Sequence, residues 1–89
     1  MSVRLRPEVR RFAERMELKL REHDDDRGNG WRQMFDEDIR ERLDDELVEL
    51  FAVWYDREER KVEAADVANF LMFLTESRQP REEFQERGR

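Results

Sequence analysis

The chain has 89 residues, of which 47% are charged and 37% are hydrophobic, and its formal net charge is −6 at pH 7. This length and composition predict one domain with a small core, and the acidic balance argues against non-specific nucleic-acid binding. Cysteine is absent and His23 is the single histidine, which excludes a disulfide scaffold, a zinc–thiolate site and any site that needs two imidazoles.

Neither a membrane span nor a secretory signal is expected from the sequence. No apolar run approaches the ~18 residues that a membrane-spanning helix requires. A secretory signal peptide has an apolar stretch after its basic start. The N-terminus of this chain starts with basic residues but lacks such a stretch. We therefore expect a cytoplasmic protein without membrane contact.

The first predicted helix spans residues 7–23. Pro7 suits a first helical turn, and apolar residues then recur at three- and four-residue steps, which places them on one helix face: Val9, Phe12, Ala13, Met16 and Leu20. His23 would lie at the C-terminal end, where the helix dipole favours a cation. Residues 24–31 interrupt the pattern with an acidic run and a Gly-Asn-Gly turn signal.

Two further helices are predicted, over residues 36–55 and 62–76. The apolar stripe of the second consists of Ile39, Leu43, Leu47, Leu50, Phe51 and Trp54. The charged connection 56–61 is short, which predicts antiparallel neighbours. Gln79-Pro80 should stop the third helix, and a polar tail follows over 78–89. With no strand-like alternation, the sequence predicts an all-α fold, a small antiparallel bundle of three main helices plus a short tail.

The third predicted helix is apolar in nearly every direction. Its polar residues between positions 63 and 74 are Glu63, Asp66 and Asn69, spaced by three. A helix that is apolar all round must be covered on all sides, and the core of this chain is small. We therefore expect oligomerisation to complete the bundle, as a homodimer or homotetramer. Trp54 would then lie in the core or in a dimer contact.

Four carboxylates can meet in the predicted hairpin. Glu46 and Glu49 on the second helix would face Glu63 and Asp66 on the third. Clustered carboxylates without imidazole favour a hard cation such as Mg²⁺ or Mn²⁺. The sequence lacks the Glu-x-x-His motif of a di-iron site, and the acidic run at 24–26 does not have the EF-hand pattern. A structural alternative stays open, in which Glu63 is a helix-end acid and Asp66 pairs with an arginine.

A family resemblance rests on these residues. Glu46-Leu-Val-Glu49-Leu, twelve residues, and then Glu63-Ala-Ala-Asp66-Val-Ala-Asn69-Phe resembles the signature of the MazG-like all-α nucleoside triphosphate pyrophosphohydrolases. Residues 12–20, followed by a glycine turn and Trp31, are similar to small phage and archaeal members. The resemblance covers about residues 12–77. The chain after residue 77 is shorter than the fourth helix of many members, and Arg78 and Arg81 are the only downstream basic candidates.

The resemblance implies magnesium-dependent cleavage of a ribo- or deoxyribonucleoside triphosphate to the monophosphate and pyrophosphate, a nucleotide-pool house-cleaning role. It assigns the metal to Glu46, Glu49, Glu63 and Asp66, and a substrate contact to Asn69. Glu46 or Glu49 would orient the attacking water or accept its proton.

Two further residues are candidate substrate contacts. Lys19 lies on the flank of the first helix's apolar stripe, where it can reach phosphate. Trp31 follows the glycine turn and can either stack on a base or clamp its loop onto the core.

Two other functional classes are alternatives. The first is a non-catalytic oligomeric helical module for interaction or regulation. The second is a nucleic-acid-binding helical protein, which the overall acidity disfavours. Its local basic cluster would consist of Arg4, Arg6, Arg10 and Arg11.

Overall fold

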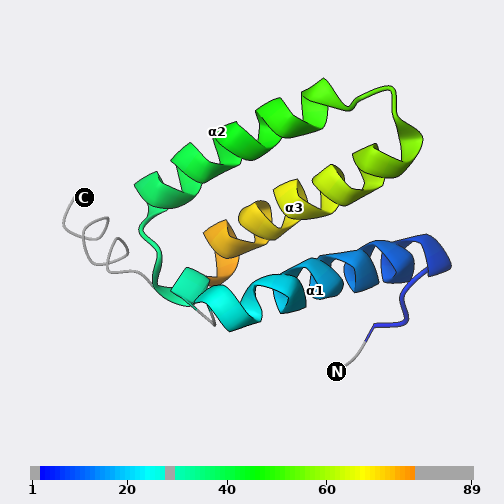
Figure 1. Ribbon diagram of the computed structural model, residues 1–89. Coiled ribbons are helices and arrows are strands. Elements are labelled where there is room, and N and C mark those ends of the chain that lie inside the picture. The colour runs from blue at the N-terminus through cyan, green and yellow to red at the C-terminus, as the bar shows by residue number, and fades with distance from the viewer. Residues whose placement is uncertain (1–2, 28–29, 78–89) are drawn as a thin grey trace, which may run out of the picture.

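The computed structural model describes residues 3–27 and 30–77. These residues form α1 (Pro7–Arg27), the short 3₁₀ helix η1 (Gly30–Gln33), α2 (Asp36–Ala52) and α3 (Arg57–Glu76), with no strand in the described ranges (Figure 1). The all-helical prediction is confirmed. The predicted tail 78–89 and the Gln79-Pro80 stop signal lie outside the described residues. In the described ranges, no helix combines the length and apolarity needed to cross a membrane.

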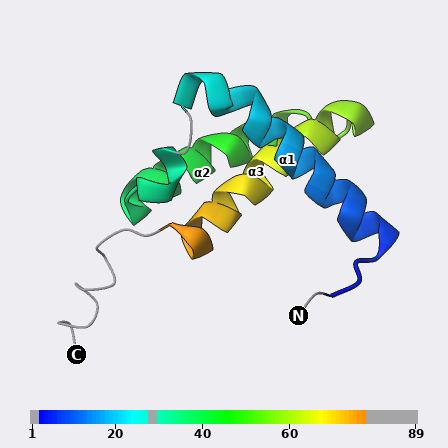
Figure 2. The same ribbon diagram turned by 90° about the horizontal axis from the view of Figure 1, so that it is seen from below.

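Helices α2 and α3 form the antiparallel hairpin that the sequence predicted, and α3 is the central element (Figure 1). It contacts α1 on one side and α2 on the other, and η1 packs near its end. Helix α1 crosses the hairpin obliquely (Figure 2). This crossing brings the C-terminal half of α1 to the middle of α3, where the polar residues of α3 lie.

The start of α3 differs from the sequence prediction. The helix begins at Arg57, five residues before the predicted start, because Asp56 is its N-cap. The Asp56 carboxylate accepts hydrogen bonds from the backbone N–H groups of Glu58 and Glu59, both at 3.1 Å. An Asp followed three residues later by Glu is the capping-box pattern, so the signal was present in the segment predicted as a connection.

Two other helix ends also differ from the prediction. Helix α1 runs through the acidic segment to Arg27 rather than ending at His23. Helix α2 ends at Ala52, because the Val53 N–H turns back to the carbonyls of Leu50 and Phe51. His23 therefore lies inside a helix and not at its C-terminal end.

The core is as small as the composition predicts. Ile39 of α2 is fully buried, and Phe70 and Phe73 of α3 complete the buried cluster. The rings of Phe70 and Phe73 meet edge to face, with centres 5.0 Å apart, a favoured aromatic geometry. The buried Ser77 closes the far end of α3, because its Oγ donates a 2.9 Å hydrogen bond to the Met34 carbonyl. This bond holds the segment after η1 against the hairpin.

The predicted apolar stripe of α2 is only partly buried. Phe51 is 60% exposed and Trp54 is also exposed, with their rings in tilted contact 5.8 Å apart. Val48 and Tyr55 are exposed as well. Phe51 and Trp54 do not lie in the core of the single chain, and α2 ends before Trp54. The alternative of a dimer contact for Trp54 stays a prediction. In the single chain, α3 is not enclosed on every side either, since Leu71 is about half exposed.

Candidate functional site

Three carboxylates meet between the two helices of the hairpin. Glu46 of α2 and Glu63 and Asp66 of α3 each place one carboxylate oxygen within 4.8 Å of the others. All three side chains are half-buried. The i,i+3 spacing on α3 places Glu63 and Asp66 on neighbouring turns of one face, and the hairpin turns that face toward Glu46. Three of the four predicted metal ligands are therefore adjacent.

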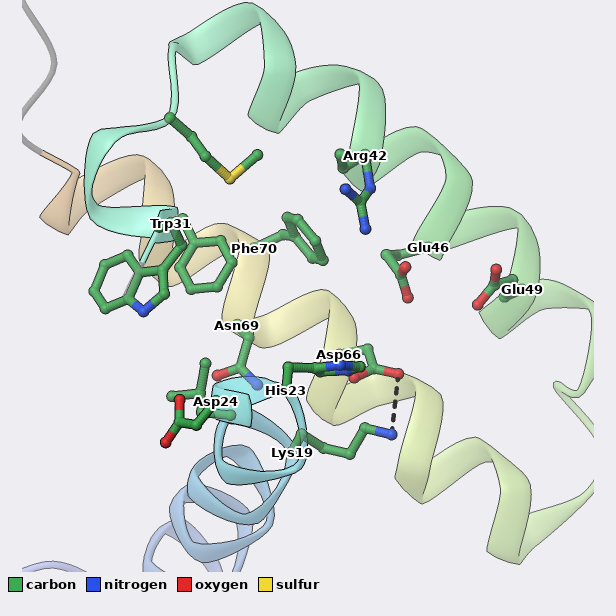
Figure 3. A pocket seen from close by; sticks show the side chains of 14 residues that line it. Lys19, His23, Asp24, Trp31, Arg42, Glu46, Glu49, Asp66, Asn69 and Phe70 are labelled. Atoms are coloured by element: carbon green, nitrogen blue, oxygen red, sulfur yellow. Dashed lines mark ion pairs between the residues drawn. The ribbon is translucent and has the colours of Figure 1, made fainter. Parts of the chain in front are cut away.

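Glu49, the fourth predicted ligand, lies outside this triad. It is one turn further along α2, it is exposed, and it lines the same pocket (Figure 3). Its negative charge is close enough to raise the pKa of both Glu46 and Glu63. Glu49 thus belongs to the electrostatic environment of the triad but keeps its carboxylate accessible to water.

The triad is protonated more readily than ordinary carboxylates. Burial, together with the charges of Glu49, Asp66 and Glu63, raises the pKa of Glu46 from 4.5 to about 7. Burial is also the main cause that raises the pKa of Glu63 and that of Asp66. Such shifts are the expected result of placing like charges together in a partly desolvated site. A divalent cation would relieve this repulsion.

Lys19 supplies a positive charge to this cluster from α1. Its Nζ lies 3.6 Å from Asp66 Oδ2 and 3.3 Å from Glu22 Oε1 (Figure 3). Burial lowers the pKa of Lys19, but the charges of Asp66, Glu22 and Glu63 outweigh it, so this pKa is raised. The ion pair that the structure gives Asp66 is therefore with Lys19, and not with an arginine as the structural alternative supposed.

Asn69 is almost completely buried, at 4% exposure, beside the carboxylates. Its Nδ2 donates a 3.1 Å hydrogen bond to the Met16 carbonyl of α1. This bond fixes the orientation of the amide, and Asn69 is one of the residues that line the pocket (Figure 3). Within the described residues, Asn69 Oδ1 has no hydrogen-bond partner, and the same is true of Glu63 Oε1. Buried acceptors without partners are uncommon and call for a missing donor or cation.

The pocket has a volume of about 480 Å³ and two unlike ends. Glu46, Glu49 and Asp66 line one end, and the other is mainly apolar and aromatic, lined by Leu20, Trp31, Met34, Phe70 and Phe73. Asn69 lies between the two ends (Figure 3). This volume is within the range of small-molecule sites, and the combination suits a ligand with a planar apolar part and a charged part.

Trp31 packs onto the core as a clamp for its loop. Its ring stacks on Phe73 with centres 4.7 Å apart and planes 14° from parallel, and the Arg32 guanidinium carbon lies 4.6 Å from its ring centre. This is the packing alternative of the sequence analysis. Trp31 nevertheless lines the pocket, so contact of the ring with a base stays a prediction.

Three residues of the pocket were missed as site candidates. Arg42 extends from α2 one turn before Glu46, and i,i+4 spacing on the same helix was the signal for it. His23 and Asp24 reach the pocket from α1. They could not be placed from sequence, because their position depends on how far α1 continues and how it crosses the hairpin.

Comparison of this chain with protein-family models, with curated proteins and with solved structures found no match. The functional argument therefore rests on the residues of the pocket.

Proposed function

We propose that this protein is a magnesium-dependent nucleoside triphosphate pyrophosphohydrolase, which converts a ribo- or deoxyribonucleoside triphosphate to the monophosphate and pyrophosphate. One observation carries the proposal. Glu46 and Asp66, two members of the carboxylate triad that Glu63 completes, line one pocket whose other end is aromatic. Asn69 lines the same pocket, and its buried amide oxygen has no partner within the described residues. The family resemblance of the Glu46–Glu49 and Glu63–Asp66 segments supports the same activity.

The residues of the triad fit a hard divalent cation. Glu46, Glu63 and Asp66 offer oxygen ligands, which Mg²⁺ and Mn²⁺ prefer, and Glu63 Oε1 is buried without a partner in the described part of the chain. When bound, such a cation supplies charge neutralisation on the phosphates and activation of water. The sequence contains no P-loop motif that would favour transfer of the terminal phosphoryl group.

Glu49 is the favoured proton acceptor of the reaction. It lies beside the triad and is exposed to water. Glu46, with its pKa of about 7, is the second candidate, since a general base works best when its pKa is near the working pH. Glu49 is preferred because it is not one of the three carboxylates that converge.

The nucleoside would occupy the apolar end of the pocket. Leu20, Met34 and Phe70 offer apolar surface to a planar base. Asn69 Oδ1, an acceptor without a partner in the described ranges, would accept a hydrogen bond from an N–H or O–H group of the nucleoside. Lys19 would leave part of its contact with Asp66 and Glu22 to approach the phosphates.

The test is a panel of the eight common nucleoside triphosphates with Mg²⁺ or Mn²⁺, reading pyrophosphate against orthophosphate. We expect pyrophosphate, and in H₂¹⁸O the label should enter the monophosphate if water attacks the first phosphorus. Glu49→Gln and Glu63→Gln should each lower turnover by orders of magnitude, whereas Glu41→Gln, at an exposed position of α2, should not. Absence of pyrophosphate from all eight nucleotides would reject the proposal in favour of a non-catalytic helical module.

A homo-oligomer is part of the proposal. Val48 and Phe51 near the end of α2 are exposed, and so is Tyr55 in the turn that follows, at 96%. Such a patch is costly to leave in water and is self-complementary in a twofold dimer. Light scattering should give a dimer or tetramer at micromolar concentration, and Phe51→Glu should shift it toward monomer. A wild-type chain that stays monomeric would exclude the oligomer.

A further inference from the structure

Arg42 lines the pocket, and its guanidinium group has no ion pair among the described residues. It extends from α2 next to Phe70, with its guanidinium carbon 5.5 Å from the ring centre (Figure 3). A cation–π contact of this kind steadies the guanidinium. Within the described ranges, the structure gives Arg42 no ion pair, whereas Arg40, two residues earlier, pairs with Asp44 on the exposed face of the same helix.

The position of Arg42 in the pocket is specific. It lies between the aromatic end and the carboxylates, and in Figure 3 Lys19 is on the opposite side of Glu46 and Asp66. Its charge is near enough to oppose the rise in the pKa of Glu46. A half-buried guanidinium in such a place, with no hydrogen-bond partner given among residues 3–27 and 30–77, is suited to an anion, which it can bind through two parallel N–H groups.

We propose that Arg42 binds the phosphate that joins the nucleoside to the rest of the polyphosphate chain. This inference rests on the proposed function. If the base lies at the aromatic end and the outer phosphates lie at the carboxylates, the group between them is that first phosphate. The same phosphate remains on the nucleoside monophosphate after pyrophosphate leaves, so Arg42 contributes to the affinity for the product as well as for the substrate.

The decisive measurement is binding, so that it does not depend on turnover. The eight common nucleoside monophosphates and their nucleosides are titrated in the presence of Mg²⁺ by calorimetry, with inorganic pyrophosphate as a third probe. The variants are Arg42→Gln, which keeps an uncharged polar stem over Phe70, Arg42→Lys, which keeps the charge, and Arg40→Gln as the matched control on α2. Thermal melts of each variant show whether it is folded.

We expect the wild-type protein to bind at least one monophosphate more tightly than its nucleoside. Arg42→Gln should lose this preference by about ten- to a hundredfold, the effect of a charge-assisted hydrogen-bond pair. Arg42→Lys should recover part of it, since lysine lacks the planar fork. Arg40→Gln should bind like wild type, and pyrophosphate affinity should fall less than monophosphate affinity in Arg42→Gln.

Three results would overturn the inference. The first is a wild-type protein that binds no monophosphate better than its nucleoside. The second is a folded Arg42→Gln variant with unchanged monophosphate affinity, which would leave Arg42 as a counter-charge for Glu46 alone. The third is an Arg42→Gln variant that loses affinity for pyrophosphate only. If monophosphate binding follows Arg42 but no nucleotide is hydrolysed, the proposed reaction fails while the phosphate contact stands.

Discussion

Lys19 of α1 and Asp66 of α3 form an ion pair with Nζ and Oδ2 3.6 Å apart, and both side chains are largely buried, at 20% and 18% exposure. The pair joins the first helix to the hairpin at the carboxylate triad. Burial raises the pKa of Asp66, and the positive charges of Lys19 and His23 oppose that rise. Lys19 is therefore a counter-ion that the chain itself provides to the acidic cluster.

Removal of this counter-ion should destabilise the metal-free protein. We expect Lys19→Gln to lower the free energy of unfolding by about 1–2 kcal/mol, because the pair is mostly shielded from water and its loss leaves the carboxylates unbalanced. The matched control is Lys61→Gln, since Lys61 pairs with Glu58 at 3.5 Å on an exposed part of α3. Urea unfolding should show a change of no more than about 0.5 kcal/mol for the control.

The contradicting result is a Lys19→Gln variant as stable as Lys61→Gln. In that case the contact between Lys19 and Asp66 contributes nothing measurable to stability, and the remaining contacts, including the hydrogen bond from Asn69 to Met16, would hold α1 on α3. A bound metal should reduce the difference in the free energy of unfolding between Lys19→Gln and wild type, because the cation then neutralises the carboxylates.

Glu46 should make the metal-free protein less stable as pH rises. Its pKa is 4.5 ordinarily and about 7 in the folded chain, so between these values the folded state holds a proton that the unfolded state has lost. The free energy of unfolding therefore falls as pH increases from about 4.5 to 7, and the loss is complete above 7. Glu46→Gln removes this contribution, so the variant should gain stability relative to wild type at pH 8 and not at pH 4.

Unfolding of metal-free protein across pH 4 to 8 measures this effect. The control is Glu41→Gln, at an exposed position on the same helix. Its free energy of unfolding should differ from that of wild type by a similar small amount at every pH. An equal offset for Glu46→Gln at pH 4 and pH 8 would mean that Glu46 titrates alike in both states.

Much of the fold was predictable because the apolar residues follow helical patterns. These patterns predicted three helices, the short connection predicted the antiparallel hairpin of α2 and α3, and the stripe of α2 included the core residue Ile39. The boundaries were less accurate, because short-range caps decide them. Asp56 begins α3 within a segment that charge alone suggested was a loop.

The site was predictable only where one helix pair determines it. Glu46, Glu63 and Asp66 face one another because the hairpin sets their register. The approach of Lys19 depends on the oblique crossing of α1, which no local pattern specifies. The orientation of the Asn69 amide, whose Oδ1 has no partner in the described residues, depends on a hydrogen bond to a residue 53 positions earlier in the chain. The sequence carries no signal for such a contact.

Mg²⁺ should stabilise the protein through the triad. At a free concentration ten times the dissociation constant, a ligand that binds only the folded state adds about 1.4 kcal/mol, which is several degrees in Tm for a chain of this size. Asp66→Asn should abolish that rise while leaving the metal-free protein at least as stable. The raised pKa of Asp66 means that its charge is unfavourable in the folded state, and Lys19 keeps its 3.3 Å pair with Glu22. NaCl at matched ionic strength is the control, and an unmoved wild-type Tm, with or without nucleotide, would make the cluster structural.

Asn69→Ala should separate ligand binding from stability. The variant loses the 3.1 Å bond to Met16 but also removes a buried oxygen without a partner in the described ranges. A typical hydrogen bond contributes about 1 kcal/mol and an unsatisfied buried group costs about 1–3 kcal/mol, so the two changes largely offset each other and Tm should move little. Nucleotide affinity should nevertheless fall about tenfold, with KM affected more than kcat, because the pocket loses the acceptor that we propose for the nucleoside.

The control is Thr75→Ala, at an exposed site on the same helix where Thr75 makes a local hydrogen bond to Met72. This variant should leave KM unchanged. A large loss of Tm with normal KM in Asn69→Ala would show that the amide serves only to join α3 to α1.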